Sequence, residues 1–407
     1  MAVRVELRRD AGKFGPALGC WWVRRRQIAR VLGPPDPQAI AELVDHRGRS
    51  LGFGLYSPES GIVLRMLSFD AKPPTDWLER RLSAALTARA RLGLRGNSDV
   101  GTSGYREINS EGDALPGLVV DRFGEHRVVQ ITTAPMAARR EAILAALGAD
   151  ESLGPPPAGT FVIGPETAAT KDGFEPFFEF RSRDQQDAPT ELEWRECGRR
   201  FAAPAPPAQK TGAYHDQRDN RESFAALLDG RGPVLDLGTH VGGFAIAAAA
   251  RGSEVVAVDQ SAAVLACAAQ NAARNGVAAR IEFVAADMFA PLDDPRLAGP
   301  FAGIVFDPPK IASSRRDLGR ALGALTRTLA QLQSRIVPQG LLAVCSCSHH
   351  LGADELDRAM LDASRATISG RTIHWTRIAH WGAGPDHPIQ PGHAEGEYLR
   401  VRVYQSR

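Results

Sequence analysis

The sequence has few cysteines and no long apolar run. Its 407 residues include five unevenly spaced cysteines, which do not suit a disulfide framework and favour a reducing compartment. The longest purely apolar run near the middle, Phe244–Ala250, is far shorter than a membrane span, and the N-terminus shows no apolar signal region. We therefore expect a cytoplasmic protein with no membrane segment, in which any single thiol is a candidate for chemistry.

The chain also has little net charge. A value of +2 excludes a protein that is basic, and so suited to nucleic acid, along its whole length. Residues 1–30, however, hold eight Arg and Lys side chains against two acids, which suits phosphate contacts or, equally, a solvated face. With 43% hydrophobic and 24% charged residues the chain should fold, and its length predicts two or three domains.

Composition separates three regions, with boundaries near residues 72 and 190. Residues 1–72 contain short alternating apolar runs that predict a small β-rich domain, and 73–190 mix helical and strand patterns that predict a central α+β domain. In 191–407 strands and helices alternate, which predicts an α/β domain with a largely parallel sheet. The expected strands of the first two regions are 39–44, 50–56, 62–69, 117–121 and 127–132, and the expected helices are 76–92 and 137–147.

Three strand ends in the last region carry ligand-binding signals. Residues 233–244 read as a strand, a glycine loop and a helix, and glycines allow the backbone to approach a ligand closely. The strand 254–259 ends in Asp259 and the strand 281–287 ends in Asp287, with a helix between them. An acid at the end of the second strand commonly binds ribose hydroxyls.

This pattern resembles the class I S-adenosylmethionine-dependent methyltransferases. The resemblance implies a Rossmann-like domain that binds S-adenosylmethionine, with Asp259 on the ribose and Asp287 on the adenine amino group. A dinucleotide-binding dehydrogenase is the alternative, but Thr239 and His240 stand where a Gly-x-Gly-x-x-Gly repeat would finish. The loop residues assigned to the cofactor site are Asp236, Gly238, Gly242, Gly243 and Phe244.

The next strand ends in Asp307-Pro308-Pro309-Lys310, a rigid turn at the edge of the sheet where α/β proteins bind ligands. In methyltransferases an Asp-Pro-Pro turn contacts the target base. Enzymes that methylate exocyclic amines usually place an aromatic residue after it, whereas this chain has Lys310, which argues against amine methylation and leaves ring-carbon chemistry open. We assign Asp307 to both cofactor binding and catalysis, and Lys310 to catalysis.

Two cysteines stand on what we expect to be the last strand, residues 341–350. Methylation of cytosine carbon 5 requires a thiolate that adds to carbon 6, so a cysteine near the cofactor is a chemical requirement. Strand alternation would put Cys345, Cys347 and His349 on one face, with Cys347 nearer the carboxyl end and therefore the expected nucleophile. The alternatives are two buried apolar fillers or a Cys-x-Cys-x-His metal site, and we expect no metal.

With these residues in view, the chain looks like the PUA-domain-containing RNA cytosine-C5 methyltransferases that modify large-subunit ribosomal RNA. The resemblance implies an RNA partner and an N-terminal PUA-like domain. It also implies that Gln217, Arg218 and Arg221 organise the cofactor pocket and that Lys210 approaches the substrate. Its strongest segments are Gln209–Arg221, Asp307–Lys310 and Ser346–Ser348, supported by Leu115–Gly117, Asp121–Gly124, Asp386–Pro388 and Gly396–Leu399.

The chain departs from this family in the glycine loop, in Tyr214-His215 before the Asp-Gln-Arg segment, and in the N-terminal entry around Gly15–Trp22. Two other functions therefore stay open. One is methylation of a guanine or adenine nitrogen, for which Cys347 would be dispensable. The other is a ribosome-assembly protein that binds RNA without catalysis. The oligomeric state, monomer or homodimer, is also open.

Overall fold

The structure is a computed structural model that describes residues 3–11, 21–96, 101–152, 154, 156–206, 212–312, 314–365 and 373–407. The chain forms two compact units, each described by itself below. The first comprises Met1–Arg195, Pro204–Gly212 and Pro385–Gly396, and the second Glu196–Ala203, Ala213–Gly384 and Glu397–Arg407. Three short segments of the predicted 191–407 domain, residues 191–195, 204–212 and 385–396, thus belong to the first unit. The domain boundaries near 72 and 190 stay predictions.

The N-terminal region is a six-stranded sheet in the order β2-β6-β5-β4-β1-β3. The predicted strands at 39–44, 50–56 and 62–69 are confirmed, and their buried apolar side chains, among them Leu43 and Met66, share a core with Val5 of β1. The strands are β1 (Arg4–Leu7), β2 (Trp22–Arg24), β3 (Ile28–Leu32), β4 (Ile40–Val44), β5 (Ser50–Tyr56) and β6 (Ile62–Ser68).

The central region is a five-stranded sheet in the order β11-β10-β9-β8-β7, with helix α1 packed in its core. The helix expected at 137–147 is instead a short α2 followed by α3. The strands are β7 (Gly104–Asn109), β8 (Leu118–Phe123), β9 (His126–Ile131), β10 (Gly159–Gly164) and β11 (Phe177–Ser182), and the helices are α1 (Trp77–Arg91), α2 (Ala134–Ala137), α3 (Arg140–Ala149) and α4 (Glu166–Asp172).

A buried ion pair joins these two regions within the first unit. Arg65 Nη2 of β6 lies 2.8 Å from Asp172 Oδ2 at the end of α4. The other carboxylate oxygen of Asp172 accepts hydrogen bonds from the Ser57 hydroxyl and the Ala134 N–H, each at 2.8 Å. Every oxygen of this buried carboxylate therefore has a partner, which is the condition under which a buried charge is tolerated.

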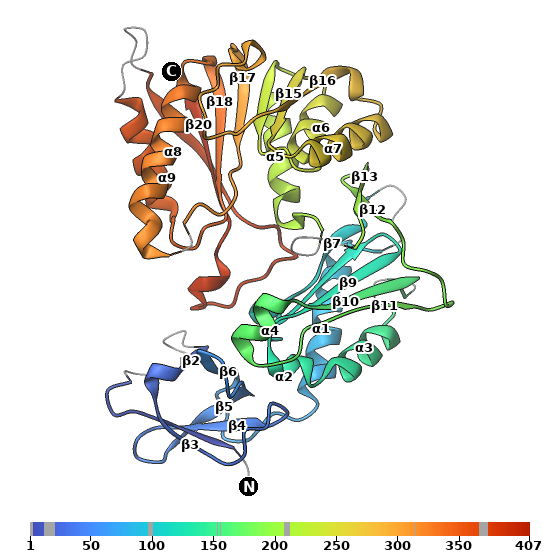
Figure 1. Cartoon of the computed structure of the whole chain (residues 1–407), viewed down its shortest axis with the longest axis vertical. Helices are drawn as coiled ribbons and strands as arrows, with labels where there is room; N and C mark the ends of the chain where they lie inside the picture. The colour runs from blue at the N-terminus through green and yellow to red at the C-terminus, as the bar shows by residue number, and fades with distance from the viewer. Residues whose placement is uncertain are drawn as a thin grey trace. The chain divides into compact units, whose positions relative to one another are not determined.

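The second unit contains a seven-stranded sheet in the order β16-β15-β14-β17-β18-β20-β19 (Figure 1). The first five strands are parallel, and β20 pairs antiparallel with both β18 and β19. The strands are β14 (Val234–Leu237), β15 (Val255–Asp259), β16 (Ile281–Ala285), β17 (Phe301–Phe306), β18 (Ile336–Ser346), β19 (Trp375–Trp381) and β20 (Arg400–Ser406).

Helices cover both faces of this sheet. Ile304 and Phe306 of β17 share a core with leucines of α8 and α9, whereas Gly303, on the opposite face, packs against Leu228 of α5. This is the doubly wound arrangement that the alternating pattern predicts. The helices are α5 (Arg218–Leu228), α6 (Gly243–Ala250), α7 (Ala262–Arg274), α8 (Leu318–Gln333) and α9 (Ala353–Ser364), preceded by the hairpin β12 (Glu191–Glu196) and β13 (Arg199–Pro204).

The expectation that residues 341–350 form the last strand is wrong. β18 ends at Ser346, and two further strands follow it. The Ser346 hydroxyl accepts the N–H of Ser348 at 3.2 Å, and Leu351 N–H donates to the Ser348 carbonyl at 3.1 Å, so local bonds turn the chain out of the sheet. Cys347 and His349 consequently do not continue the strand face that carries Cys345.

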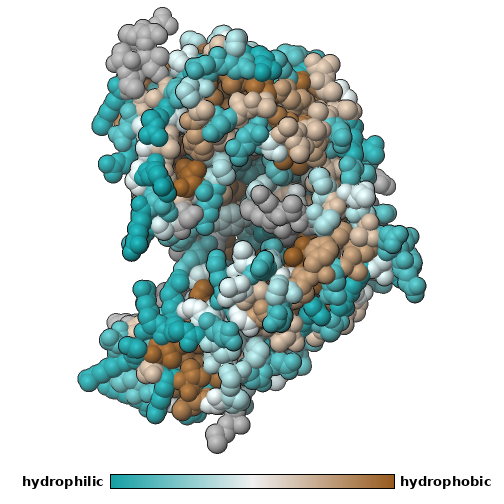
Figure 2. Space-filling model, in the orientation of Figure 1, coloured by the Kyte–Doolittle hydropathy of each residue, from teal (hydrophilic) through white to brown (hydrophobic). Residues whose placement is uncertain are grey.

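None of the helices in the described ranges is both long and apolar enough to cross a membrane. On the face drawn in Figure 2, hydrophobic residues lie in small patches between hydrophilic ones.

Candidate active site

The glycine loop between β14 and α6 is built by close backbone approaches. Gly238 has a φ of 91°, and a Cβ on it would lie 2.3 Å from the carbonyl oxygen of Asp307. Only glycine allows both features. Asp236 supports the loop from inside the sheet, where its Oδ2 accepts the Ala245 N–H in the first turn of α6 at 3.0 Å. Burial raises the pKa of Asp236 to about 6, although the Thr239 hydroxyl and the Ala245 N–H lower it.

The two predicted cofactor acids lie at the same edge of the sheet, because β15 and β16 are parallel neighbours. Asp259 is half-buried and accepts the N–H of His240 at 3.3 Å and of Ser261 at 3.0 Å. Asp287 is exposed and accepts the Phe289 N–H at 2.9 Å. A glycine loop at the start of a helix with two accessible carboxylates beside it fits a bound nucleoside, whose hydroxyl and amino groups are donors.

The segment that contains Asp216-Gln217-Arg218 contacts the Asp-Pro-Pro turn through Gln217 and the start of α6 through Arg221. Gln217 Nε2 donates to Asp307 Oδ2 at 3.1 Å, next to the backbone against which Gly238 packs. Arg221 Nη1 pairs with the buried Glu196 at 2.6 Å, and a Cβ on Gly243 would lie 2.4 Å from Arg221 Nε. Gly243 therefore makes room for the guanidinium. Lys210, expected near the substrate, lies outside the described residues.

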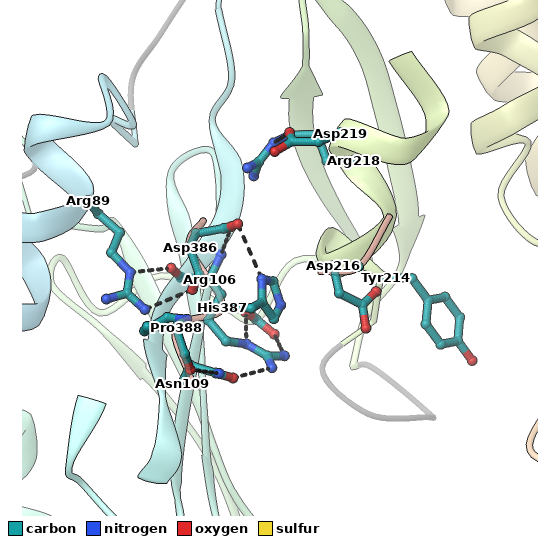
Figure 3. Close-up of polar contacts among 12 residues, drawn as sticks. Arg89, Arg106, Asn109, Tyr214, Asp216, Arg218, Asp219, Asp386, His387 and Pro388 are labelled. Carbon is teal, nitrogen blue, oxygen red and sulfur yellow. Dashed lines mark hydrogen bonds and ion pairs between the residues drawn. The ribbon is translucent and has the colours of Figure 1, made fainter. Parts of the chain in front are cut away.

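Two predicted cofactor residues make other contacts. Arg218 Nε pairs with Asp219 Oδ1 at 3.0 Å, as Figure 3 shows. Phe244 is buried and its ring packs edge-on against Phe224, with centroids 6.3 Å apart, so it joins α6 to α5. Gly242, with a φ of 90°, is the N-cap residue of α6. Contact of these residues with a cofactor stays a prediction.

The two cysteines differ in environment. Cys345 is fully buried in β18, and burial, with Asp307 adding to it, raises the pKa of its thiol well above the usual value. Cys347 is half-buried and follows the end of the strand. The Ser348 hydroxyl accepts the Ala312 N–H at 3.2 Å, which joins the loop after β18 to the loop after β17. The loop that carries Cys347 is thus joined to the segment that follows the Asp-Pro-Pro turn.

Tyr214 is a site residue to which the sequence assigned no role. Burial raises the pKa of its phenol, and the charges of Cys347 and Asp307 raise it further. Its ring packs against His240 of the glycine loop, with centroids 4.9 Å apart. Lys310 is exposed at the other end of the turn. No group of His, Cys, Asp and Glu that could hold a metal ion occurs in the described part of the chain.

Three further residues were also missed: Asn220, Asp216 and Tyr398. Asn220 Nδ2 donates to Gln217 Oε1 at 2.7 Å, and the Tyr398 hydroxyl donates to Asp216 Oδ2 at 2.6 Å. Both pairs lie within motifs that carry the family resemblance, which is the signal by which they could have been found.

The fold and this site define a class I S-adenosylmethionine-dependent methyltransferase. Residues 186–373 match the S-adenosylmethionine-dependent methyltransferase family, and residues 17–69 match the PUA-like domain family. The fold is similar to a solved S-adenosylmethionine-dependent methyltransferase from Streptococcus mutans, with a TM-score of 0.79, 17% identity and full coverage of both chains. A structure of SMU.776, a methyltransferase complexed with SAH, gives a TM-score of 0.77 at 16% identity, again over both full chains.

Curated relatives define the family more narrowly. The chain is 33% identical to a ribosomal RNA large subunit methyltransferase of Deinococcus radiodurans, over 94% of this chain and 93% of the relative. It is 32% identical to ribosomal RNA large subunit methyltransferase I of Photobacterium profundum, over 93% of each. The chain belongs to this family of S-adenosylmethionine-dependent methyltransferases, which join a PUA-like domain to a methyltransferase domain.

Proposed function

We propose that the protein methylates carbon 5 of a cytosine in large-subunit ribosomal RNA, with Cys347 as the covalent nucleophile. The names of the relatives support the RNA substrate. The observation that carries the choice of cytosine carbon 5 is the position of Cys347, a half-buried thiol just beyond the end of β18, in a loop that Ser348 joins to the loop after β17. Cys345 is a poorer candidate because it has no exposed surface and its pKa is raised.

In this reaction the thiolate of Cys347 adds to carbon 6 of the cytosine, and the displaced electron pair makes carbon 5 nucleophilic. S-adenosylmethionine, when bound, supplies the electrophilic methyl group. Carbon 5 then loses its proton, and the electron pair of that bond expels the Cys347 thiolate and restores the aromatic ring. Asp307, which accepts a hydrogen bond from Gln217, is the residue proposed to orient the base, and Lys310, the exposed cation of the same turn, is the residue proposed to stabilise the thiolate.

RNA binding is proposed for the N-terminal basic stretch, but fewer of its arginines are available than the sequence suggested. Arg24 pairs with Glu395, and Arg30 pairs with Glu6 at 2.6 Å. Arg25 donates to the carbonyls of Pro58 and Ser60. Arg26 is exposed and suits a phosphate contact. The cytoplasmic location stays a prediction.

The test uses large-subunit ribosomal RNA that contains 5-fluorocytidine. Fluorine at carbon 5 cannot leave as a cation, so the adduct should persist and slow the protein on a denaturing gel when S-adenosylmethionine is present. Cys345→Ala should keep this shift, and Cys347→Ala should lose both the shift and turnover. Normal methylation of RNA by Cys347→Ala would overturn the proposal and favour an enzyme that methylates a nitrogen.

A further inference from the structure

The second compact unit is here called the methyltransferase unit, and between β19 and β20 the chain leaves it. Residues Pro385–Gly396, here called the strap, pack as part of the first unit. The buried Asp386 accepts the Arg106 N–H through Oδ2 at 3.0 Å, and its carbonyl accepts Arg89 Nη2 at 2.8 Å (Figure 3). Asn109 Nδ2 donates to the carbonyl of Pro388 at 3.0 Å. The first half of the strap is thus fixed to the central region.

The second half of the strap contacts the PUA-like region of the same unit. The ring of His393 packs edge-on against Trp22, with centroids 4.8 Å apart. Glu395 Oε1 pairs with Arg24 Nη2 at 3.0 Å. Arg24 and Trp22 both lie in β2, within the predicted RNA-binding domain. The strap is therefore anchored in both regions of the first unit.

On either side of the strap, the chain contacts residues 214–221 of the methyltransferase unit. Before the strap, the Gly384 N–H donates to the Asp216 carbonyl at 3.3 Å, and the Gly382 carbonyl accepts Asn220 Nδ2 at 2.9 Å. After the strap, the Tyr398 hydroxyl donates to Asp216 Oδ2 at 2.6 Å. Asp216 is buried and directly precedes Gln217, so both ends of the strap are tied to the segment that contacts Asp307.

We propose that Asp216 and Tyr398 are positioning residues of the methyltransferase site. The Tyr398 hydroxyl donates a short hydrogen bond to the Asp216 carboxylate, and hydrogen bonds to carboxylates are the stronger kind in proteins. This bond holds residues 214–221 in the position where Gln217 contacts Asp307 and Arg221 contacts Gly243. The strap makes this geometry depend on its anchorage in the unit that carries the PUA-like domain. Cofactor affinity is thereby coupled to that anchorage. The proposal rests on the proposed function only in taking this site as the place of methyl transfer.

The experiment measures the dissociation constant of S-adenosylmethionine by calorimetry. Tyr398→Phe removes one hydroxyl and should weaken binding roughly tenfold, the loss of a hydrogen bond to a charged group. Tyr404→Phe is the matched control, because Tyr404 also lies on the β20 side of the strap and donates to a carboxylate, Asp357 Oδ1, at 2.7 Å. Asp357 belongs to α9, away from residues 214–221, so this variant should bind within twofold of the wild type.

The role of the strap is tested by combining variants. Asn109→Ala removes an anchor and should weaken cofactor binding about threefold. The double variant Asn109→Ala/Tyr398→Phe should bind S-adenosylmethionine no more than twofold more weakly than Tyr398→Phe alone. The reason is that both substitutions weaken the same connection between the strap and residues 214–221. Fully additive losses of affinity in the double variant would overturn the proposal, because independent destabilising effects add in this way. An equal loss of affinity in Tyr398→Phe and Tyr404→Phe would overturn it as well.

A second pair covers the case in which Tyr398→Phe does not fold. Asp216→Asn keeps an acceptor for the Tyr398 hydroxyl and should bind within threefold of the wild type, whereas Asp216→Ala should lose about tenfold. Equal losses in the two variants would contradict a positioning role. Cys347→Ala separates this proposal from the function itself, because it should bind S-adenosylmethionine normally while losing turnover.

Discussion

Asp236 is a carboxyl group buried under the glycine loop, and its raised pKa has a consequence for stability. Because the folded-state pKa, about 6, lies above the ordinary value of 3.8, the folded protein holds this proton more tightly than the unfolded chain. The group therefore stabilises the fold most below pH 4, and this contribution is lost as the pH rises to about 6. At about 1.4 kcal/mol for each pH unit by which a pKa moves, the loss is about 3 kcal/mol.

Asp236→Asn should remove this pH dependence, because the amide oxygen can still accept the Ala245 N–H and carries no charge. Between pH 4 and pH 7 the free energy of unfolding of the wild type should fall by about 3 kcal/mol more than that of the variant. The measurement is urea unfolding of both proteins across that range without cofactor. Identical pH profiles would show that Asp236 is not the group responsible.

At the scale of elements, the loops before and after α6 each contain a glycine with a positive φ, and we predict unequal effects when the two are substituted. Gly238→Ala meets both an unfavourable φ and the Asp307 carbonyl, so it should displace the Asp-Pro-Pro turn. We expect it to weaken S-adenosylmethionine binding at least tenfold in calorimetry. Gly252→Ala, at a φ of 102° with no atom within 4 Å of the added Cβ, should cost only about 1 kcal/mol of stability and leave affinity unchanged. Similar affinities for the two variants would show that the contact with Asp307 is unimportant.

Which elements the sequence could predict depended on burial. β15 ends in Asp259 and β16 ends two residues before Asp287, and parallel strands place their carboxyl ends at one edge, so the two acids could be assigned together. β19 is half exposed, and its polar residues conceal it from a pattern based on apolar runs. The early end of β18 depends on the hydroxyls of Ser346 and Ser348, which composition does not reveal.

Prediction of the candidate site from the sequence was also confined to residues that lie in local patterns. The glycine loop, Asp307 and Cys347 follow local patterns, and a hydrogen bond from the Ala312 N–H to the Ser348 hydroxyl joins the loops that follow β17 and β18. The position of Gln217 and Arg221 over that loop depends on contacts between residues distant in sequence, so only the family resemblance pointed to it. Arg218 and Phe244 have local partners, Asp219 and Phe224, that spacing could not distinguish from cofactor contacts.

At the scale of the whole molecule, the two compact units should respond to different perturbations. Asp172→Ala leaves the buried Arg65 without its carboxylate and should destabilise the first unit by about 3 kcal/mol. S-adenosylmethionine should instead stabilise the methyltransferase unit. Differential scanning calorimetry should show two transitions, one lowered by Asp172→Ala and the other raised by the cofactor.

The control for this prediction is Glu42→Ala, which removes the carboxylate partner of Arg4, an arginine whose side chain is 51% exposed. Exposed pairs contribute little, so its effect should stay below about 1 kcal/mol. A single transition that moves equally with Asp172→Ala and with cofactor would show that the two units do not unfold separately.

The strap also bears on the order of events during synthesis. Translation delivers the chain from its N-terminus at about 5–20 residues per second, so Pro385–Gly396 follows Arg195 by roughly 10–40 s. During that delay the newly made first unit lacks its partners for the Arg106 N–H and for one hydrogen bond of the Arg89 guanidinium. Its maturation on the ribosome must therefore wait for most of the methyltransferase unit to emerge, and a fragment ending at Arg195 would remain in this unfinished state.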